Sequence, residues 1–248
     1  MTFRDHFSIH AREYARYRPR YPRELFEYLA SLCDTCDTAW DCATGNGQAA
    51  IALARHFELV IATDASAAQI SHAIDHPQVD YRVVPAHDSD IFEHSIDLVT
   101  VAQAIHWFDL DKFYAEVQRV LKPGGILAFW GYSLCYSSPE IDACIRRFYN
   151  DVIHDYWPPE RRFIEEHYSS FTVPFPEIQP PDFPMTAEWK LADYISYLKT
   201  WSAVQRYISK NGSDPVDILA KEMEMLWGDP AQSKTVTFPM FVRVARVG

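Results

Sequence analysis

The amino-acid sequence predicts an α/β fold built on a doubly wound, mostly parallel sheet. Segments typical of strands and segments typical of helices alternate regularly from residue 37 to residue 132. This alternation is characteristic of parallel sheets in which a helix connects each strand to the next. Such connections are right-handed, so the helices are expected to cover both faces of the sheet. Aromatic and proline-rich stretches break the alternation over residues 133–200, where we expect an inserted helical and irregular segment after the fifth strand.

Local signals mark the elements of the alternating region. Pro22 suits the first turn of a helix, and apolar residues follow it at helical spacing. Ser66 has a side chain suited to cap a helix, and "KPGG" ends the last helix before the fifth strand. In chain order we expect a helix over 22–33, a strand ending near 42, a glycine turn and helix reaching 57, a strand over 58–64, a helix over 66–74, a strand over 79–84, a strand over 95–105, a helix over 109–121 and a strand over 126–132.

The pattern is less regular near the C-terminus. Residues 188–208 have the composition of one long helix, and residues 234–247 that of a final strand or a pair of strands. Pro239 lacks the N–H that a strand ladder needs, so we expect this last part at a sheet edge or a bulge.

Composition disfavours several classes of protein. The chain has 248 residues, with 23 Lys and Arg against 34 Asp and Glu, and its net charge of −11 disfavours general binding to nucleic acid. No apolar run approaches the roughly 20 residues that span a bilayer, and the N-terminus has no signal-peptide pattern, so we expect a cytoplasmic protein without membrane contact. The five cysteines lack a disulfide-like spacing. Cys33 and Cys36 form an isolated C-x-x-C pair, and we expect no metal site.

A glycine turn follows the first strand expected in the sheet. Ligands bind at the carboxyl ends of parallel strands, and Gly45 and Gly47 let the backbone approach a ligand closely. Asp64 ends the second strand 19 residues after Gly45, which suits a carboxylate that accepts hydrogen bonds from two ribose hydroxyls. Gly45, Gly47 and Ala50 also fit the G-x-G-x-x-A pattern of NAD(P)-binding proteins, so these residues alone leave a nicotinamide cofactor open.

Three further motifs narrow the choice of cofactor. Asp41 opens the pattern D-x-A-x-G-x-G, "PAHD" follows the third strand, and "RVLKPGGILAF" leads into the fifth. Over residues 37–132 this combination resembles the class I S-adenosylmethionine-dependent methyltransferases. The stretches "YARYRPRYP" and "AQAIHWFD" extend the resemblance to a subgroup that acts on small molecules and includes trans-aconitate methyltransferase-like proteins.

The resemblance implies a Rossmann-like fold with a seven-stranded, mostly parallel sheet and the cofactor S-adenosyl-L-methionine. It also implies one methyltransferase domain over residues 1–248. Its expected parts are an N-terminal helical lid (1–36), a cofactor-binding core (37–132), a substrate-side insertion (133–200), and a C-terminal helix and strands (201–248).

Roles for individual residues follow from the same resemblance. Ala43 stands where the family usually has its first glycine, and the added methyl group could weaken binding of the cofactor. The implied contacts are Asp41, Ala43, Gly45 and Gly47 around the methionine part of the cofactor, Asp64 on the ribose hydroxyls, Ala65 beside the adenine, Ala86, His87 and Asp88 along the adenine edge, and Gln103 near the sulfonium. His87 and Asp88, with Asp90, could also be metal ligands, although polar residues after a strand more often form a turn.

His106 is the candidate catalytic residue, because it follows Gln103 on the loop where the fourth strand ends. A hydroxyl or amine acceptor needs a general base, and histidine usually serves when its pKa lies near the working pH. A carboxylate acceptor needs no base, and His106 could instead be structural. Trp107 would form a wall of the substrate site.

Other candidate substrate contacts lie outside the core. Tyr14, Tyr17 and Arg18 would belong to the lid, and Arg18 could pair with a carboxylate of the cofactor or the acceptor. Arg161 and Arg162, in "PPERRF", are a second candidate pair for a carboxylate, with a solvated surface as the alternative.

Transfer of a methyl group from S-adenosylmethionine to a small molecule is the function that these features favour, with O-methylation of a carboxylic acid as one candidate. The alternatives are an NAD(P)-dependent oxidoreductase and a module that binds S-adenosylmethionine without turnover.

Overall fold

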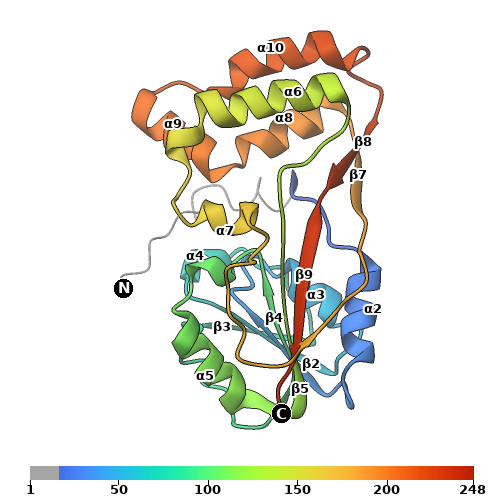
Figure 1. Ribbon diagram of the computed structural model, residues 1–248, viewed down its shortest axis with the longest axis vertical. Coiled ribbons are helices and arrows are strands. Elements are labelled where there is room, and N and C mark those ends of the chain that lie inside the picture. Colours follow the sequence, from blue (N-terminus) through green and yellow to red (C-terminus); the bar gives the residue numbers. More distant parts are fainter. Residues whose placement is uncertain (1–16) are drawn as a thin grey trace.

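The computed structural model describes residues 17–248, which contain a seven-stranded sheet (Figure 1). Its strand order is β3-β2-β1-β4-β5-β9-β6. The strands from β1 to β5 are parallel, whereas β9 runs antiparallel to both of its neighbours. The expected doubly wound, mostly parallel sheet is therefore confirmed. The strands are β1 (Thr38–Cys42), β2 (Leu59–Asp64), β3 (Val79–Val83), β4 (Ile96–Ala102), β5 (Leu121–Tyr132), β6 (Glu177–Ile178) and β9 (Met240–Arg246), and the helices beside them are α2 (Arg23–Ser31), α3 (Gln48–Leu53), α4 (Ala67–Ile70) and α5 (Leu110–Val120).

The two faces of the sheet are buried by different helices, because successive residues of a strand point to opposite sides. Trp40 and Val99 pack on one face with residues of α5. Ala39 and Leu98, one position earlier in each strand, pack on the other face with α2 and α3. Figure 1 shows α5 on one side of the sheet and the pair of α2 and α3 on the other. Burial of both faces explains why these strands are almost continuously apolar.

A second layer, which we call the cap, lies above the carboxyl end of β5 (Figure 1). Its helices share one core cluster that includes Ile141, Leu198, Met223 and Trp227, and a two-stranded sheet of β7 and β8 packs with them. The boundary expected at residue 200, between the insertion and the C-terminal part, falls inside this layer. The helices before and after that residue belong to the same core cluster. The cap consists of α6 (Pro139–Arg147), α8 (Leu191–Lys199), α9 (Ser202–Asn211), α10 (Val216–Trp227), β7 (Met185–Trp189) and β8 (Lys234–Phe238).

The single long helix expected over residues 188–208 is wrong. Its first residues belong to β7, and Trp201 has an extended backbone (φ −67°, ψ 133°) that separates α8 from α9. The carboxylate of Asp193 accepts a hydrogen bond from the N–H of Lys190 at 3.1 Å and so favours a helix start at that point. Burial of the Trp201 ring against Tyr197 and Trp157 then stabilises the break.

The edge position expected for the C-terminal strand is also wrong for β9, which lies between β5 and β6. Pro239 belongs to neither strand. It stands between β8 in the small sheet and β9 in the large one, so its missing N–H removes no bond from either ladder.

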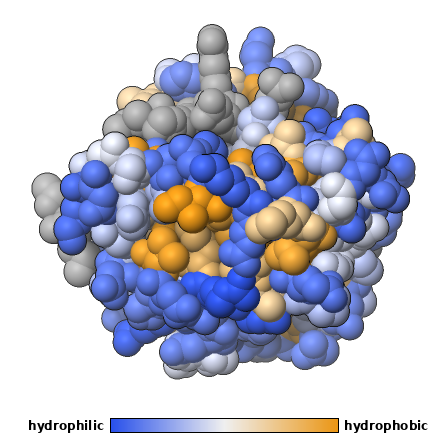
Figure 2. Space-filling view, turned by 90° about the horizontal axis from the view of Figure 1, so that it is seen from above, coloured by the Kyte–Doolittle hydropathy of each residue, from blue (hydrophilic) through white to orange (hydrophobic). Residues whose placement is uncertain are grey.

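Seen from above, the molecule shows hydrophobic side chains in the middle of the face, surrounded by hydrophilic ones (Figure 2). On α10, Ile218 and Met225 are 80% and 79% exposed. Within residues 17–248 no helix combines the length and apolar character needed to cross a membrane.

Candidate functional site

Asp64 links the glycine turn to the end of β2. Its carboxylate accepts hydrogen bonds from the N–H of Gly45 at 2.9 Å and from the N–H of Ser66 at 2.8 Å. The N–H of Thr44 donates to the carbonyl of Thr63 at 2.9 Å. The loops after β1 and β2 are therefore held together at the carboxyl edge of the sheet. This is the edge where the sequence analysis predicts that the ligand binds.

The glycine turn has an unusual backbone. Ala43, Gly45 and Gly47 all have positive φ angles, of 55°, 58° and 86°. A Cβ on Gly47 would lie 2.1 Å from the Tyr81 hydroxyl, so neither the backbone nor the available space accommodates a side chain there. Alanine in this region of φ costs about 1 kcal/mol or more, and Ala43 is therefore a strained position.

Replacing Ala43 with glycine is expected to stabilise the fold by roughly 0.5 kcal/mol, because relief of about 1–2 kcal/mol of strain exceeds the roughly 0.5–1 kcal/mol of added entropy in the unfolded chain. Urea unfolding of the two proteins measures the difference. A less stable Ala43→Gly variant would show that packing of the methyl group outweighs the backbone strain.

Asp41 is buried beneath the turn, with 1% of its surface exposed. Its carboxylate accepts hydrogen bonds from the hydroxyls of Thr44 at 2.6 Å and Thr100 at 2.8 Å. Burial nevertheless raises the pKa of Asp41 from 3.8 to about 6, and the negative charge of Asp64 adds to this shift. At neutral pH the protein therefore holds a desolvated carboxylate beside its glycine turn.

The raised pKa predicts a distinct pH dependence of stability. Because the folded state binds this proton more tightly than the unfolded chain does, Asp41 destabilises the fold above about pH 6, and the penalty disappears as the pH falls below 4. The penalty is about 3 kcal/mol. Asp41→Asn should therefore raise the free energy of unfolding at pH 7 and leave it almost unchanged at pH 4. Equal effects at both pH values would contradict a titrating Asp41.

The residues expected along the adenine lie at the same edge of the sheet. Ala65, His87 and Asp88 are exposed, and Ala86 is half-buried. The turn that carries them is held by Ser89, whose N–H and hydroxyl both donate to the buried carboxylate of Glu116. Among the described residues no cluster of His, Cys, Asp or Glu could hold a metal ion.

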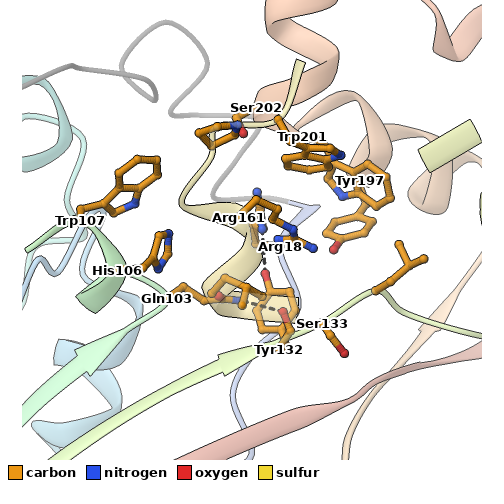
Figure 3. A pocket seen from close by; sticks show the side chains of 14 residues that line it. Arg18, Gln103, His106, Trp107, Tyr132, Ser133, Arg161, Tyr197, Trp201 and Ser202 are labelled. Atoms are coloured by element: carbon orange, nitrogen blue, oxygen red, sulfur yellow. Dashed lines mark hydrogen bonds between the residues drawn. The ribbon is translucent and has the colours of Figure 1, made fainter. Parts of the chain in front are cut away.

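A second site, which we call the central pocket, lies where β4 and β5 end beneath the cap. Figure 3 shows Gln103, His106 and Trp107 on one side of it and Tyr197 and Trp201 on the other. The amide of Gln103 donates to the carbonyl of Tyr132 at 3.2 Å and so lies across the ends of both strands. The pocket is lined by Arg18, Gln103, His106, Trp107, Tyr132, Ser133, Leu134, Trp157, Pro158, Arg161, Ile164, Tyr197, Trp201 and Ser202.

Two guanidinium groups lie between these walls (Figure 3). Arg18 donates to the hydroxyl of Tyr132 at 2.8 Å, and Arg161, in α7 (Arg161–Glu165), stacks 4.7 Å from the centre of the Trp157 ring. Arg162 is exposed and lies over Phe163 outside the pocket. Of the two arginines considered as a pair for a carboxylate, only Arg161 lines the pocket.

The lid residues are only partly described by the structure. Tyr17 is half-buried and packs against the core of the cap. Tyr14 lies outside the described residues.

His106 does not have the pKa expected of a general base. It belongs to the short helix η2 (Ile105–Trp107), and its Nδ1 lies 3.0 Å from the buried hydroxyl of Tyr168. Burial, assisted by the positive charge of Arg161, lowers the pKa of His106 to about 3. The imidazole is therefore neutral at physiological pH, whereas a histidine that serves as a general base usually has a pKa near the working pH.

Several aromatic residues of the central pocket could not be identified from the sequence. Tyr132 at the end of β5, Trp157, and the pair of Tyr197 and Trp201 come from three separated segments of the chain. The unusual stretch "YWPPERRF" was a signal for Trp157, but nothing local indicated Tyr197 or Trp201. The isolated pair Cys33 and Cys36 lies elsewhere, and burial raises the pKa of the Cys33 thiol to about 12, which makes it a poor nucleophile.

Comparison with known proteins identifies the family. Residues 40–129 match the model of a methyltransferase domain. A Dictyostelium discoideum protein named as a methyltransferase is 32% identical over 252 residues, which cover 98% of this chain and 95% of the relative. This chain belongs to the class I S-adenosylmethionine-dependent methyltransferases.

Two further comparisons agree with this assignment. A protein of Saccharomyces cerevisiae named as a probable S-adenosylmethionine-dependent methyltransferase is 31% identical over 134 residues, 50% of this chain and 46% of that protein. The solved structure of a protein from Anaeromyxobacter dehalogenans, described as a type II methyltransferase, is 41% identical, has a TM-score of 0.87, and aligns over 93% of this chain and 98% of that one. The alternative of a nicotinamide-dependent enzyme is therefore wrong.

The carboxyl edge of the sheet in this methyltransferase fits its cofactor, S-adenosylmethionine. The carboxylate of Asp64 stands at the end of β2 beside the glycine turn, where it could accept hydrogen bonds from ribose hydroxyls. A Cβ added to Gly45 would make only an ordinary van der Waals contact, with the side-chain oxygen of Gln69 at 3.9 Å. Asp64 and the glycine turn lie side by side at this edge and could hold S-adenosylmethionine there.

Proposed function

We propose that this methyltransferase transfers the methyl group to a carboxylate oxygen of a small organic acid bound in the central pocket. The observation that carries the proposal is the position of Arg161. Its guanidinium lines the pocket, and among the described residues no Asp or Glu carboxylate lies within ion-pair distance of it. A buried or half-buried arginine without a carboxylate partner is suited to bind an anionic ligand.

Arg161 is held in one orientation by its neighbours. Its Nε donates to the hydroxyl of Tyr149 at 3.0 Å, and that hydroxyl in turn donates to the carboxylate of Glu165. The ring of Trp157 supports one face of the guanidinium. These contacts leave the terminal nitrogens of Arg161 for a bidentate interaction with a carboxylate.

The rest of the pocket supports a small acid with an apolar body. Trp107, Trp157, Tyr197 and Trp201 provide aromatic walls. The indole N–H of Trp157 is buried and has no hydrogen-bond partner within residues 17–248, so it offers a further donor to the ligand. The net charge of −11 disfavours a nucleic-acid acceptor, and the resemblance to the trans-aconitate methyltransferase-like subgroup agrees with an acid.

The chemistry of a carboxylate acceptor matches the groups in the pocket. S-adenosylmethionine supplies an activated methyl group on a sulfonium when it is bound. The protein's residues then need to align and desolvate an acceptor that is already ionised at neutral pH, and they need not remove a proton. This requirement is compatible with the low pKa of His106.

The test is transfer of radiolabelled methyl groups from S-adenosylmethionine to a panel of matched aromatic and aliphatic acids, alcohols, phenols and amines. Methyl esters release volatile methanol in mild alkali, whereas methyl ethers and methylamines do not. We expect label only in alkali-labile products of the acids. Stable products from a phenol or an amine would overturn the carboxylate proposal while leaving the family intact.

A further inference from the structure

We propose that Tyr168 holds His106 as the neutral tautomer with its proton on Nε2, so that His106 donates a hydrogen bond to the acceptor and does not act as a base. Tyr168 is then a positioning residue for His106. The identity of the acceptor group rests on the function proposed above, whereas the tautomer of His106 can be observed without any acceptor.

The hydrogen bond between Tyr168 and His106 determines the tautomer. The side chain of Tyr168 is buried, and among the described residues its hydroxyl has one hydrogen-bond partner, the Nδ1 of His106 at 3.0 Å. If Nδ1 carried the proton, the phenolic O–H would be a buried donor without an acceptor, which is costly. If Nδ1 is unprotonated, the hydroxyl donates to it and the penalty disappears. The second arrangement leaves the proton of the neutral imidazole on Nε2.

Tyr168 cannot easily move away from this bond. Its ring stacks on Phe171 at 5.1 Å between centres with an angle of 10°, and it also packs against Phe129 and Phe241. Its backbone has a φ of 56°, a strained value for a bulky residue. Arg243 stabilises this backbone by donating to the carbonyl of Tyr168 at 2.7 Å. Strained backbone held by several contacts is typical of residues that serve a site.

The opposite side of the imidazole belongs to the central pocket. His106 lines the pocket beside Gln103 (Figure 3), and in the described part of the chain its Nε2 has no hydrogen-bond partner. The charged and titratable groups around it are Arg161 from α7, Arg18 from the N-terminal segment, Tyr132 at the end of β5, and Tyr168. Among residues 17–248 no carboxylate lines this part of the pocket to favour an imidazolium, and burial together with Arg161 lowers the pKa of His106.

An N–H donor suits the methylation of a carboxylate. During the transfer a bond forms between the carboxylate oxygen and the methyl carbon, the bond from sulfur to that carbon breaks with its electron pair left on sulfur, and no proton moves. His106 would hold the second carboxylate oxygen through Nε2–H, while Arg161 holds the charge of the group. A general base in this position would have no proton to remove.

The first test is to read the tautomer of His106 by long-range ¹H–¹⁵N correlation NMR on the uniformly ¹⁵N-labelled protein. His106→Gln identifies the signals of His106 among those of the 10 histidines. We expect the pattern of a neutral Nε2–H imidazole that does not titrate between pH 5 and 8. An Nδ1–H pattern, or a titration in that range, would overturn the proposal directly in the unmodified protein.

A pair of tyrosine variants isolates the role of the Tyr168 hydroxyl. Tyr168→Phe should abolish the tautomer preference and raise the pKa of His106. The matched control is Tyr114→Phe, because Tyr114 is buried in the same core cluster and its hydroxyl has no hydrogen-bond partner within residues 17–248. The control should leave the His106 signals unchanged. Unchanged signals in folded Tyr168→Phe would also contradict the proposal.

Kinetics supply a separate readout once an acceptor is known from the panel. His106→Gln keeps an N–H donor near the position of Nε2 and should retain activity within about tenfold, whereas His106→Ala should lose more. The rate of the unmodified enzyme should not depend on pH at alkaline values, above the pH range in which Asp41 titrates. If no acid is methylated, the proposed function is wrong. The NMR measurements on His106 and on Tyr168→Phe still test the proposed tautomer, because they need no acceptor.

Discussion

Replacement of Arg161 by alanine is expected to lower kcat/KM for a carboxylic acid acceptor about 100-fold, which is the largest effect we predict on turnover. Loss of one partner from a desolvated, bidentate ion pair costs about 3 kcal/mol, and each 1.4 kcal/mol corresponds to about tenfold in rate. The measurement is the initial rate over a range of acceptor concentrations at saturating S-adenosylmethionine. Stability should fall by only about 1–2 kcal/mol, because the variant loses the bond to Tyr149 and the stacking on Trp157 but no ion pair within the described residues.

Two variants serve as controls for this result. Arg162→Ala removes the same charge from the next position, where the side chain is exposed outside the pocket, and it should leave kcat/KM within about twofold. Arg161→Lys keeps the charge but loses the bond from Nε to Tyr149 and the planar fork, so an intermediate loss is expected. Equal activity of Arg161→Ala and Arg162→Ala would remove Arg161 from the acceptor site.

The core of the fold could be predicted from the sequence because its signals are local. Strands β1, β2 and β4 are short, mostly apolar runs, and burial of both faces demands this pattern. The glycine turn was equally recognisable, because Gly47 needs both its φ of 86° and the space that the Tyr81 hydroxyl occupies. Asp64 followed from its position after the second strand and its spacing from Gly45.

The cap and the pocket beneath it could not be predicted in the same way. Trp201 interrupts a helical pattern because its ring is buried against Tyr197 and Trp157, and such contacts between distant segments leave no local periodicity. The state of His106 likewise depends on Tyr168, which lies 62 residues further along the chain. A histidine at the end of a strand indicates a site, but only its burial and its partner decide which proton it carries.

Replacement of Asp64 by alanine is expected to raise the dissociation constant for S-adenosylhomocysteine about 100-fold. The proposed contact comprises two hydrogen bonds from ribose hydroxyls to a carboxylate, each of about 1.5 kcal/mol or more. The variant also loses the acceptor for the N–H groups of Gly45 and Ser66, which orders the loops after β1 and β2. Isothermal titration calorimetry with S-adenosylhomocysteine measures the effect without any methyl acceptor.

A contact with the ribose can be separated from a purely structural role of Asp64. Asp64→Asn keeps one amide oxygen for the backbone N–H groups but loses the charge, so its unfolding midpoint should fall less than that of Asp64→Ala while its affinity stays low. Asp182→Ala removes a charge from an exposed residue in the loop before β7 and controls for the change in net charge. If affinity instead follows the loss of stability across the three variants, Asp64 acts by shaping the glycine turn. The ribose would then have to be bound by other residues at the carboxyl edge of the sheet.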